Sequence, residues 1–268
     1  MSRLLDRGGL WSKRLVRSLS GGLKRKCCFV HIPKCAGTSL NRALAGVCGL
    51  RQHYCRITSV PSRKSTAILY GVKPEKMFSG TAEADDAYRA IFEHREALTM
   101  YALASGETVV TGHFLYSDRA FRAFGDQYGF ITVLRAPLSR MISHYGYIQA
   151  TGELDVNFDD YLNSSLARRH GSEMTRYLCG TPDRSEDELT DALALAKENL
   201  RNFAVVGFTE DMDKFAKDFE AAFQAPLTIP RRNTAKGAKP QLSPDQIDAL
   251  KGISAIDQDL YDWAQSNL

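Results

Sequence analysis

The stretch from Cys27 to Leu44 constrains the fold of this chain more than any other. Its first residues, Cys27 to Ile32, are apolar or favour β structure and stop at Pro33, which predicts a short buried strand. Its last residues place apolar side chains at helical spacing, with Thr38 or Ser39 as the expected N-cap. Between strand and helix lies a tight loop with one lysine, one glycine and two hydroxyls. This is the layout of a phosphate-binding loop.

The start of the predicted helix suits an anion, because the first N–H groups of a helix are unpaired and its dipole is positive there. Lys34 would add a positive charge to the loop. The loop is not a Walker A sequence, since in that motif the lysine stands directly before the Ser or Thr. Here Lys34 precedes Gly37 and Thr38 instead. An ordinary strand-to-helix turn with a solvated lysine stays open as the alternative.

The loop closely resembles the 5′-phosphosulfate loop of sulfotransferases that use 3′-phosphoadenosine 5′-phosphosulfate (PAPS), in the residues His31-Ile-Pro-Lys-Cys-Ala-Gly-Thr-Ser-Leu40. Within that family it looks most like the carbohydrate branch that contains the heparan and dermatan 2-O-sulfotransferases. The family has a second motif, a strand that ends in Arg with a Ser eight residues later. The stretch from Ile131 to Tyr145 matches it, with Arg135 and Ser143. Two motifs in the right order are far more specific than either alone.

The resemblance implies that both motifs bind PAPS. Arg135 and Ser143 would converge on one phosphate, and the planar fork of arginine suits bidentate contacts to phosphate oxygens. A salt bridge at a helix start is the alternative for Arg135, and a bond to its own backbone for Ser143. In relatives a late basic loop closes over the 3′-phosphate. The predicted nucleotide-binding residues are Lys34, Cys35, Ala36, Gly37, Thr38, Ser39, Arg135, Ser143, Arg232, Asn233 and Thr234.

His113 is the predicted general base. It follows a β-branched run, residues 108–111, and a glycine, and a side chain directly after a strand of an open α/β sheet faces the crevice where ligands bind. On position alone a structural histidine is the commoner interpretation. In the 2-O-sulfotransferases a Gly-His pair after this strand carries the base, and Gly112-His113 matches it. His144, which adjoins Ser143, is the weaker rival.

The resemblance implies in-line transfer of a sulfuryl group from PAPS to a hydroxyl, on a carbohydrate or glycolipid acceptor. His113 would accept the hydroxyl proton, for which an ordinary histidine pKa near 6.5 is suitable. Lys34 would stabilise charge on the departing phosphate, and no metal ion is required. The segment from Glu173 to Gly180 resembles a family segment near the acceptor. Arg176 is therefore predicted to contact the acceptor, with a structural ion pair as the alternative.

Two other functions stay open. A P-loop-type kinase of a small molecule would share the sheet and the loop, but it would prefer ATP with magnesium. A non-catalytic nucleotide-binding scaffold would bind the nucleotide without turnover and would not depend on His113.

Strand and helix patterns alternate along the chain, which predicts an α/β fold: a single domain with a P-loop-like, mostly parallel sheet flanked by helices. Further buried strands are expected at residues 130–134 and 203–208. Residues 48–80 show no sustained period and are expected to form an irregular connection with short elements. We predict a sulfotransferase-like domain over residues 26–268, preceded by a basic N-terminal arm over residues 1–25.

The basic charge is concentrated in that arm. Residues 1–26 hold eight Lys or Arg and one acid, so they carry +7 and the rest of the chain carries −3 of the net +4. The body of the protein is therefore not expected to bind nucleic acid. The arm also has apolar residues that would line one side of a basic amphipathic helix, which predicts peripheral membrane contact. A partly ordered leader and a mitochondrial transit peptide stay open.

The apolar runs and the cysteines indicate the cellular compartment in which the protein is expected. No apolar run approaches the length of a membrane-spanning helix, and none forms a secretory signal. None of the six cysteines forms Cys-x-x-Cys, so a zinc site is not expected. The default prediction is a cytoplasmic protein with reduced thiols, with peripheral membrane contact through its arm as predicted above.

Overall fold

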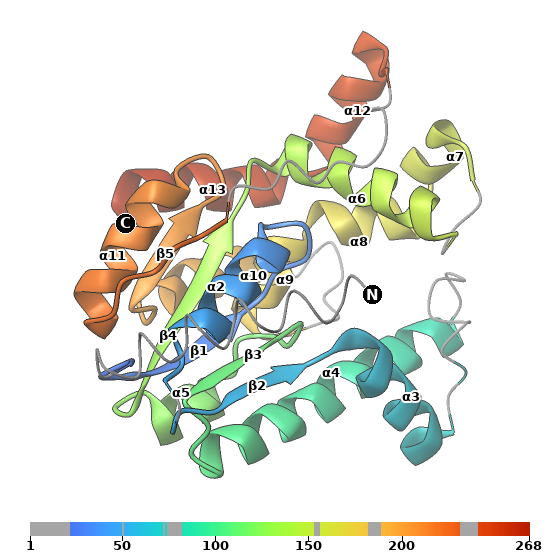
Figure 1. Ribbon diagram of the computed structural model, residues 1–268. Helices are drawn as coiled ribbons and strands as arrows, with labels where there is room; N and C mark the ends of the chain where they lie inside the picture. The colour runs from blue at the N-terminus through green and yellow to red at the C-terminus, as the bar shows by residue number, and fades with distance from the viewer. Residues whose placement is uncertain are drawn as a thin grey trace, which may run out of the picture.

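The computed structural model describes residues 22–49, 51–71, 73, 82–152, 156–181, 189–230 and 241–268. Its strands form one sheet in the order β2-β3-β1-β4-β5, and all pairings in it are parallel (Figure 1). The strands are β1 (Lys26–Val30), β2 (Tyr54–Ile57), β3 (Val109–Gly112), β4 (Tyr128–Leu134) and β5 (Val205–Phe208). The predicted α/β fold with a mostly parallel sheet in one domain is confirmed.

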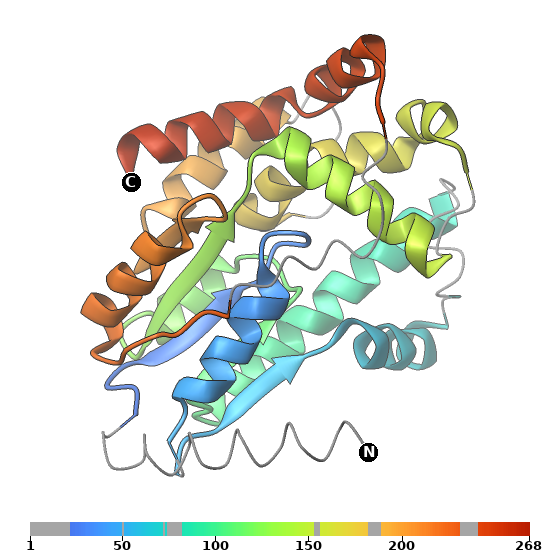
Figure 2. The same ribbon diagram turned by 45° about the horizontal axis from the view of Figure 1, so that its top comes forward.

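Helices cover both faces of this sheet. Figures 1 and 2 show α2 on one face and α4 on the other, and α6, α7, α8 and α12 pack together beyond the end of β4. The helices are α2 (Gly37–Val47), α3 (Ser59–Tyr70), α4 (Ala82–Ala104), α5 (Asp118–Phe124), α6 (Pro137–Thr151), α7 (Phe158–Leu162), α8 (Ser165–Gly171), α9 (Glu173–Cys179), α10 (Leu189–Leu200), α11 (Met212–Phe223), α12 (Pro244–Ile253) and α13 (Ala255–Asn267).

The central strands are buried on both faces, which explains why their sequences are almost continuously apolar. Every residue of β4 is buried, as are the last four of β1. Parallel strands between two helix layers typically show this pattern. The hydroxyl of Thr132, in the middle of β4, donates to the carbonyl of Val30 at 3.0 Å, so the polar group in this core is satisfied.

The strand order places a topological switch point at β1. The chain leaves β1 for the edge strand β2, returns through β3 and then crosses to β4 on the other side of β1. Connections therefore diverge at the carboxyl end of β1, between β3 and β4. Ligands of open α/β sheets bind in the crevice at such a point.

The segment 48–80 holds a strand and a helix that the sequence pattern did not reveal. The edge strand β2 buries only Ile57, while Arg56 is exposed. In α3 the fully buried residues are Ser62 and Thr66, both polar. Apolar periodicity therefore had nothing to detect in either element. The short strand β2 agrees with the expected irregular connection with short elements, whereas the 12-residue helix α3 is longer than that prediction allowed.

Capping residues set several helix boundaries. Pro137 stands in the first turn of α6, and Ser243 with Gln246 forms a capping box at the start of α12. The side chain of Asn157 caps α7. The hydroxyl of Ser164 accepts from the N–H of Ala167 and starts α8 as a separate helix.

The predicted N-terminal arm lies mainly outside the described residues. Its last part, residues 22–25, packs on the domain. Leu23 is buried in the main core, and Arg25 Nη2 donates to the carbonyls of Gly125 and Tyr128 at 2.8 and 3.2 Å. Contact of the arm with a membrane surface stays a prediction.

A buried charged cluster joins α6, α8, α9 and α13. Arg140 of α6 is completely buried and donates to a carboxylate oxygen of Glu173 and to the carbonyl of His170. Asp257 of α13 lies 3.5 Å from Arg140 Nη2. Asp257 also accepts from the N–H and hydroxyl of Thr175, both at 2.8 Å. A residue far along the chain thus caps the start of α9.

A histidine pair completes this cluster. His144 stacks on His170 with ring centroids 3.7 Å apart, and its Nδ1 lies 3.3 Å from Glu173 Oε2. Burial acts to raise the pKa of Glu173, but the fields of His144, Arg140 and His170 outweigh it and lower that pKa to about 2. Glu173 therefore stays ionised inside the protein.

We expect Arg140→Ala to destabilise the protein by about 3–5 kcal/mol, because it leaves Glu173 and Asp257 as buried carboxylates without their counter-charge. Urea unfolding followed by circular dichroism measures the change. Lys214→Ala is the control. It removes an exposed ion pair with Asp218, in which Nζ and Oδ2 lie 2.8 Å apart, and should cost less than about 1 kcal/mol. Equal losses in the two variants would show that the cluster does not tie the helices together.

Candidate functional site

The register of the sheet brings the predicted residues to one edge. Val30 of β1 pairs with Gly112 of β3, so the residues that follow, His31 and His113, are neighbours. The N–H of His31 donates to the carbonyl of Gly112 at 3.0 Å, which extends the pairing by one residue. On the other side of β1, β4 ends and is followed by Arg135. The site is therefore built on the carboxyl ends of three adjacent strands.

The loop between β1 and α2 turns through two residues in the left-handed region, Lys34 at φ 65° and Ala36 at φ 53°. Such a conformation costs a residue other than glycine about 1–2 kcal/mol. The helix begins at Gly37, and its N-cap is Ala36, which has no side chain to accept a hydrogen bond. The expected cap by Thr38 or Ser39 was wrong, because the backbone already enters the helix before these residues.

The start of α2 presents free backbone donors. Its first helical hydrogen bond runs from the N–H of Leu40 to the carbonyl of Ala36 at 3.1 Å. Within the described part of the chain, the N–H groups of residues 36–39 have no acceptor. An anion with several oxygens can accept from donors arranged in this way. The strained loop and the missing cap together favour a phosphate-like ligand here.

Cys35 is packed into the protein within this loop. Its side chain is fully buried, and burial raises the pKa of its thiol to about 12. Its N–H donates to the carbonyl of Ile32 at 3.3 Å. Its contact with a nucleotide stays a prediction.

Side chains of the second motif lie beside the loop. Arg135 Nη1 donates to the carbonyl of Lys34 at 3.0 Å, and Lys34 Nζ lies 4.4 Å from the ring centroid of Tyr147 on α6. Burial and the charge of Arg135 lower the pKa of Lys34. Ser143 stands four residues before Tyr147, on the same face of α6. The structure thus brings Arg135 of the second motif against Lys34 of the first, while the contact of Ser143 with a nucleotide stays a prediction.

His113 is held as a neutral base. Its Nδ1 lies 2.8 Å from the carbonyl oxygen of His31, so Nδ1 carries the proton and Nε2 has a free lone pair. Burial, and next the charge of Arg95, lower the pKa of His113 to about 4. The expected pKa near 6.5 was wrong, because the sequence does not show how deeply this ring is buried. At neutral pH the imidazole is uncharged and can accept a proton.

Arg95, which the sequence analysis did not single out, fixes the backbone of the base. It is buried on α4, its Nη1 donates to the carbonyl of His113 at 2.8 Å, and its Nε donates to the hydroxyl of Ser62 on α3 at 3.0 Å. The contact ties β3 to two helices. A signal was present, since Arg95 follows Ile91 and Phe92 at helical spacing and so lies on the apolar face of α4.

Asn41 is a second residue that the sequence analysis missed. Its Oδ1 accepts from the hydroxyls of Tyr54 on β2 and Thr111 on β3, at 2.9 and 2.7 Å. Its Nδ2 donates to the carbonyl of Gly37 at 2.8 Å and lies 3.4 Å from His31 Nδ1. This buried amide therefore links two strands to the loop and to the first turn of α2.

The remaining predicted residues lie elsewhere. His144, the rival base, belongs to the buried cluster around Glu173. Arg176 of α9 is partly buried, and its Nε donates to the hydroxyl of Ser172 at 2.7 Å. Its contact with an acceptor stays a prediction. Outside the described residues lie the predicted 3′-phosphate contacts Arg232, Asn233 and Thr234.

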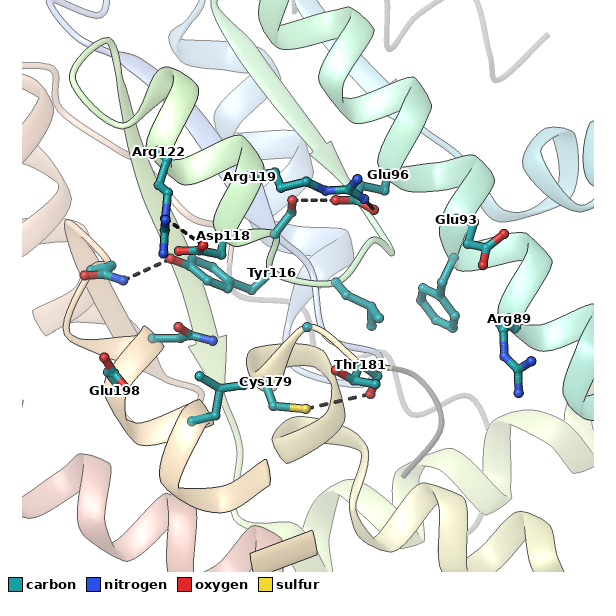
Figure 3. A pocket seen from close by; sticks show the side chains of 17 residues that line it. Arg89, Glu93, Glu96, Tyr116, Asp118, Arg119, Arg122, Cys179, Thr181 and Glu198 are labelled. Atoms are coloured by element: carbon teal, nitrogen blue, oxygen red, sulfur yellow. Dashed lines mark hydrogen bonds and ion pairs between the residues drawn. The ribbon is translucent and has the colours of Figure 1, made fainter. Parts of the chain in front are cut away.

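A cavity of about 810 Å³ lies apart from the loop, between α4, α5, α9 and α10 (Figure 3). Its charged side chains are largely paired with one another. Arg119 lies 2.7 Å from Glu96, and Arg122 lies 2.7 Å from Asp118. No residue of the β1–α2 loop lines this cavity. We therefore place the candidate site at the carboxyl ends of the strands.

Two further features were sought in the part of the chain that the structure describes. No group of three or more His, Cys, Asp or Glu side chains there is placed to hold a metal ion. No helix in the same ranges is long and apolar enough to cross a membrane.

Comparisons with known proteins find a likeness among solved structures. No family model and no curated protein matches the chain. Among solved structures, the chain is similar to the crystal structure of a sulfotransferase from Alicyclobacillus acidocaldarius, with 16% sequence identity over 90% of this chain and 95% of that chain, and a TM-score of 0.45. A likeness at this identity and TM-score does not support an inference about function. The function is therefore inferred from the residues of this chain.

We expect the imidazole of His113 to stay neutral, with its proton on Nδ1, between about pH 7.5 and about pH 5.5. An ordinary histidine gains its second proton over that range. Nitrogen-15 NMR of the ring reports both the charge and the tautomer. Arg95→Gln should raise the pKa, because it removes a nearby positive charge. A titration midpoint near 6.5 in the native protein would contradict the assignment.

Proposed function

We propose that this protein transfers a sulfuryl group from PAPS to a hydroxyl of a carbohydrate or glycolipid. One observation carries the proposal: a neutral imidazole, His113, stands one strand away from a loop whose backbone donors have no partner among the described residues. Sulfuryl transfer to a hydroxyl needs both parts, a base for the hydroxyl proton and donors for the charge that develops on the leaving phosphate. The two sequence motifs, which resemble those of PAPS-dependent sulfotransferases, support PAPS as the nucleotide.

On the nucleotide side, we propose that the N–H groups of residues 36–39 hold the 5′-phosphosulfate and that Arg135 with Ser143 holds the 3′-phosphate. Arg135 uses one N–H on the carbonyl of Lys34, which leaves further donors of its planar fork for phosphate oxygens. Thr38 is exposed and Ser39 half-buried, so both hydroxyls are accessible to a ligand. Arg232, Asn233 and Thr234 remain predicted contacts to the 3′-phosphate.

The sheet order gives each substrate its own side of β1. Arg135 follows β4, whereas His113 follows β3, on the opposite side. A nucleotide bound between the loop and Arg135 would therefore present its sulfuryl group toward β3. The acceptor would approach over the carboxyl ends of β3 and β2, where its hydroxyl meets His113. Arg176 is kept as a predicted acceptor contact.

In the proposed reaction the acceptor oxygen attacks sulfur, and the bond between sulfur and the bridging phosphate oxygen breaks. His113 Nε2 takes the hydroxyl proton, and the imidazolium keeps its Nδ1–H bond to the carbonyl of His31. The negative charge of bound PAPS raises the pKa of His113 and so favours this transfer. Lys34 and the loop N–H groups stabilise charge on the leaving phosphate, and one such donor contributes roughly 3–4 kcal/mol.

We expect His113→Ala to lower the rate of transfer by about 10²–10⁴, the usual contribution of a general base. Its affinity for adenosine 3′,5′-bisphosphate (PAP), the nucleotide product, should stay nearly native. The assay follows sulfur-35 from PAPS into a panel of glycans and glycolipids. His53→Ala is the matched control, because His53 is exposed and precedes β2, at the amino ends of the strands rather than the carboxyl ends.

Each rival function gives a different result in this assay. A kinase would transfer phosphate from ATP with magnesium and leave the sulfur label on PAPS. A scaffold would bind the nucleotide with no turnover in either the native protein or His113→Ala. If His113→Ala transfers sulfur at the native rate, His113 is not the base, but the proposed reaction still stands.

A further inference from the structure

The ring of His31 fills the space between the base and the phosphate loop. Its centroid lies 4.0 Å from that of His113, with 29° between the ring planes, and 5.2 Å from that of Phe29. The ring also lies against the backbone of Gly37. A Cβ added at Gly37 would come within 1.5 Å of His31 Nε2, so any larger residue at the start of α2 would collide with this ring.

His31 is fixed by more than packing. It is buried, and its Nδ1 faces the amide nitrogen of Asn41 at 3.4 Å, so Nδ1 accepts. Burial, and next the neighbouring His113, hold the pKa of His31 well below its ordinary value. Its backbone carbonyl accepts from His113 Nδ1. The ring is thus neutral, and both its edges and its faces have defined neighbours.

We infer that His31 is a positioning residue, whose ring sets the plane of the base His113 and the distance from that base to the first turn of α2. The inference rests on the proposed function, because it takes His113 as the base. Its physical basis is that one flat ring contacts both reacting sides, the imidazole that would take the proton and the glycine that opens the anion-binding turn.

The contacts of the His31 ring with His113 and Gly37 are expected to affect the rate of sulfuryl transfer. In-line transfer requires the acceptor oxygen, held at His113, to reach the sulfur, held at the loop, along a fixed line. A displacement of roughly 1 Å in such a geometry can cost about 10²-fold in rate. Removing the ring would release His113 on one side and the first turn of α2 on the other, while the backbone carbonyl of residue 31 stays in place.

The first test compares His31→Ala with His31→Phe. His31→Ala should lower kcat at least about tenfold and change the KM for PAPS much less. It should also move the ascending limb of the pH profile of kcat/KM for PAPS, which reports the free protein, upward from near pH 4 toward about 6.5, because water then reaches His113. His31→Phe restores a flat ring and should recover most of kcat and the native limb.

The other charged groups around His113 stay in place in both variants. They are Arg95 of α4, Arg56 of β2 and Glu173 of α9, so the shift of the limb reports the loss of the ring. Val110→Ala is the matched control, since Val110 is a buried residue of β3 that precedes the site. It should lower the melting temperature without moving the limb. Native kcat and a native limb in folded His31→Ala would overturn the inference.

The second test does not need turnover. Gly37→Ala should weaken PAP binding and lower the melting temperature, because its Cβ collides with the His31 ring. In the His31→Ala background the same change should be tolerated, since the ring is gone. Additive losses in this double-mutant cycle would overturn the inference.

The two tests also separate the inference from the proposed function. If native protein transfers no sulfur from PAPS, the proposed function fails. The cycle, together with the pKa of His113 measured by NMR in His31→Ala, then still decides whether the ring positions His113 and the loop. A pKa of His113 that does not change in His31→Ala would count against it, whereas the tautomer should stay the same because the carbonyl of residue 31 is kept.

Discussion

The hydrogen bonds that pair β1 with β3 fix the arrangement of the whole site. They place Val30 opposite Gly112, and the next residues, His31 and His113, then stack above the end of the sheet. The carbonyl of His31 selects the tautomer of His113. The same strand continues into the loop that opens α2. A shift of this register by one residue would separate the base from the loop, because successive side chains of a strand point to opposite faces.

The buried cluster around Arg140 supports the other half of the site. It joins α6 to α9 and α13, and α6 also carries Tyr147, whose ring lies beside Lys34 of the loop. The ionised Glu173 also raises the pKa values of His113 and Lys34, which favours their positively charged forms. This effect is smaller than that of burial, which lowers both. The cluster thus links the stability of the helices to the charge of the site.

Much of the site could be predicted from the sequence because its main parts are local. A buried strand, a loop and a helix start follow one another in the chain, and Arg135 and His113 stand where apolar strands end. Contacts between distant elements were harder to predict. Arg95 and Asn41 lie on the apolar faces of helices, where a polar residue is a signal of a buried contact, but their partners become visible only once α3, β2 and β3 are assembled.

The pKa of His113 and the elements β2 and α3 could also not be predicted from local sequence patterns. The ring of His113 packs against that of His31, and both burial and the charge of Arg95 lower its pKa; no local pattern predicts these neighbours. β2 and α3 were missed because their exposed and polar residues carry no apolar period. The strained φ angles at Lys34 and Ala36 also need the structure.

The central claim is that this site is built for a nucleotide phosphorylated at both the 3′ and 5′ positions and needs no metal to bind it. Isothermal titration calorimetry in the presence of a chelator tests it most directly. We predict that PAP binds under these conditions, and that Arg135→Ala weakens PAP by about tenfold or more through loss of a charged contact, while adenosine 5′-phosphosulfate is little affected. Preference for ATP with magnesium, or equal weakening of both ligands, would contradict the claim.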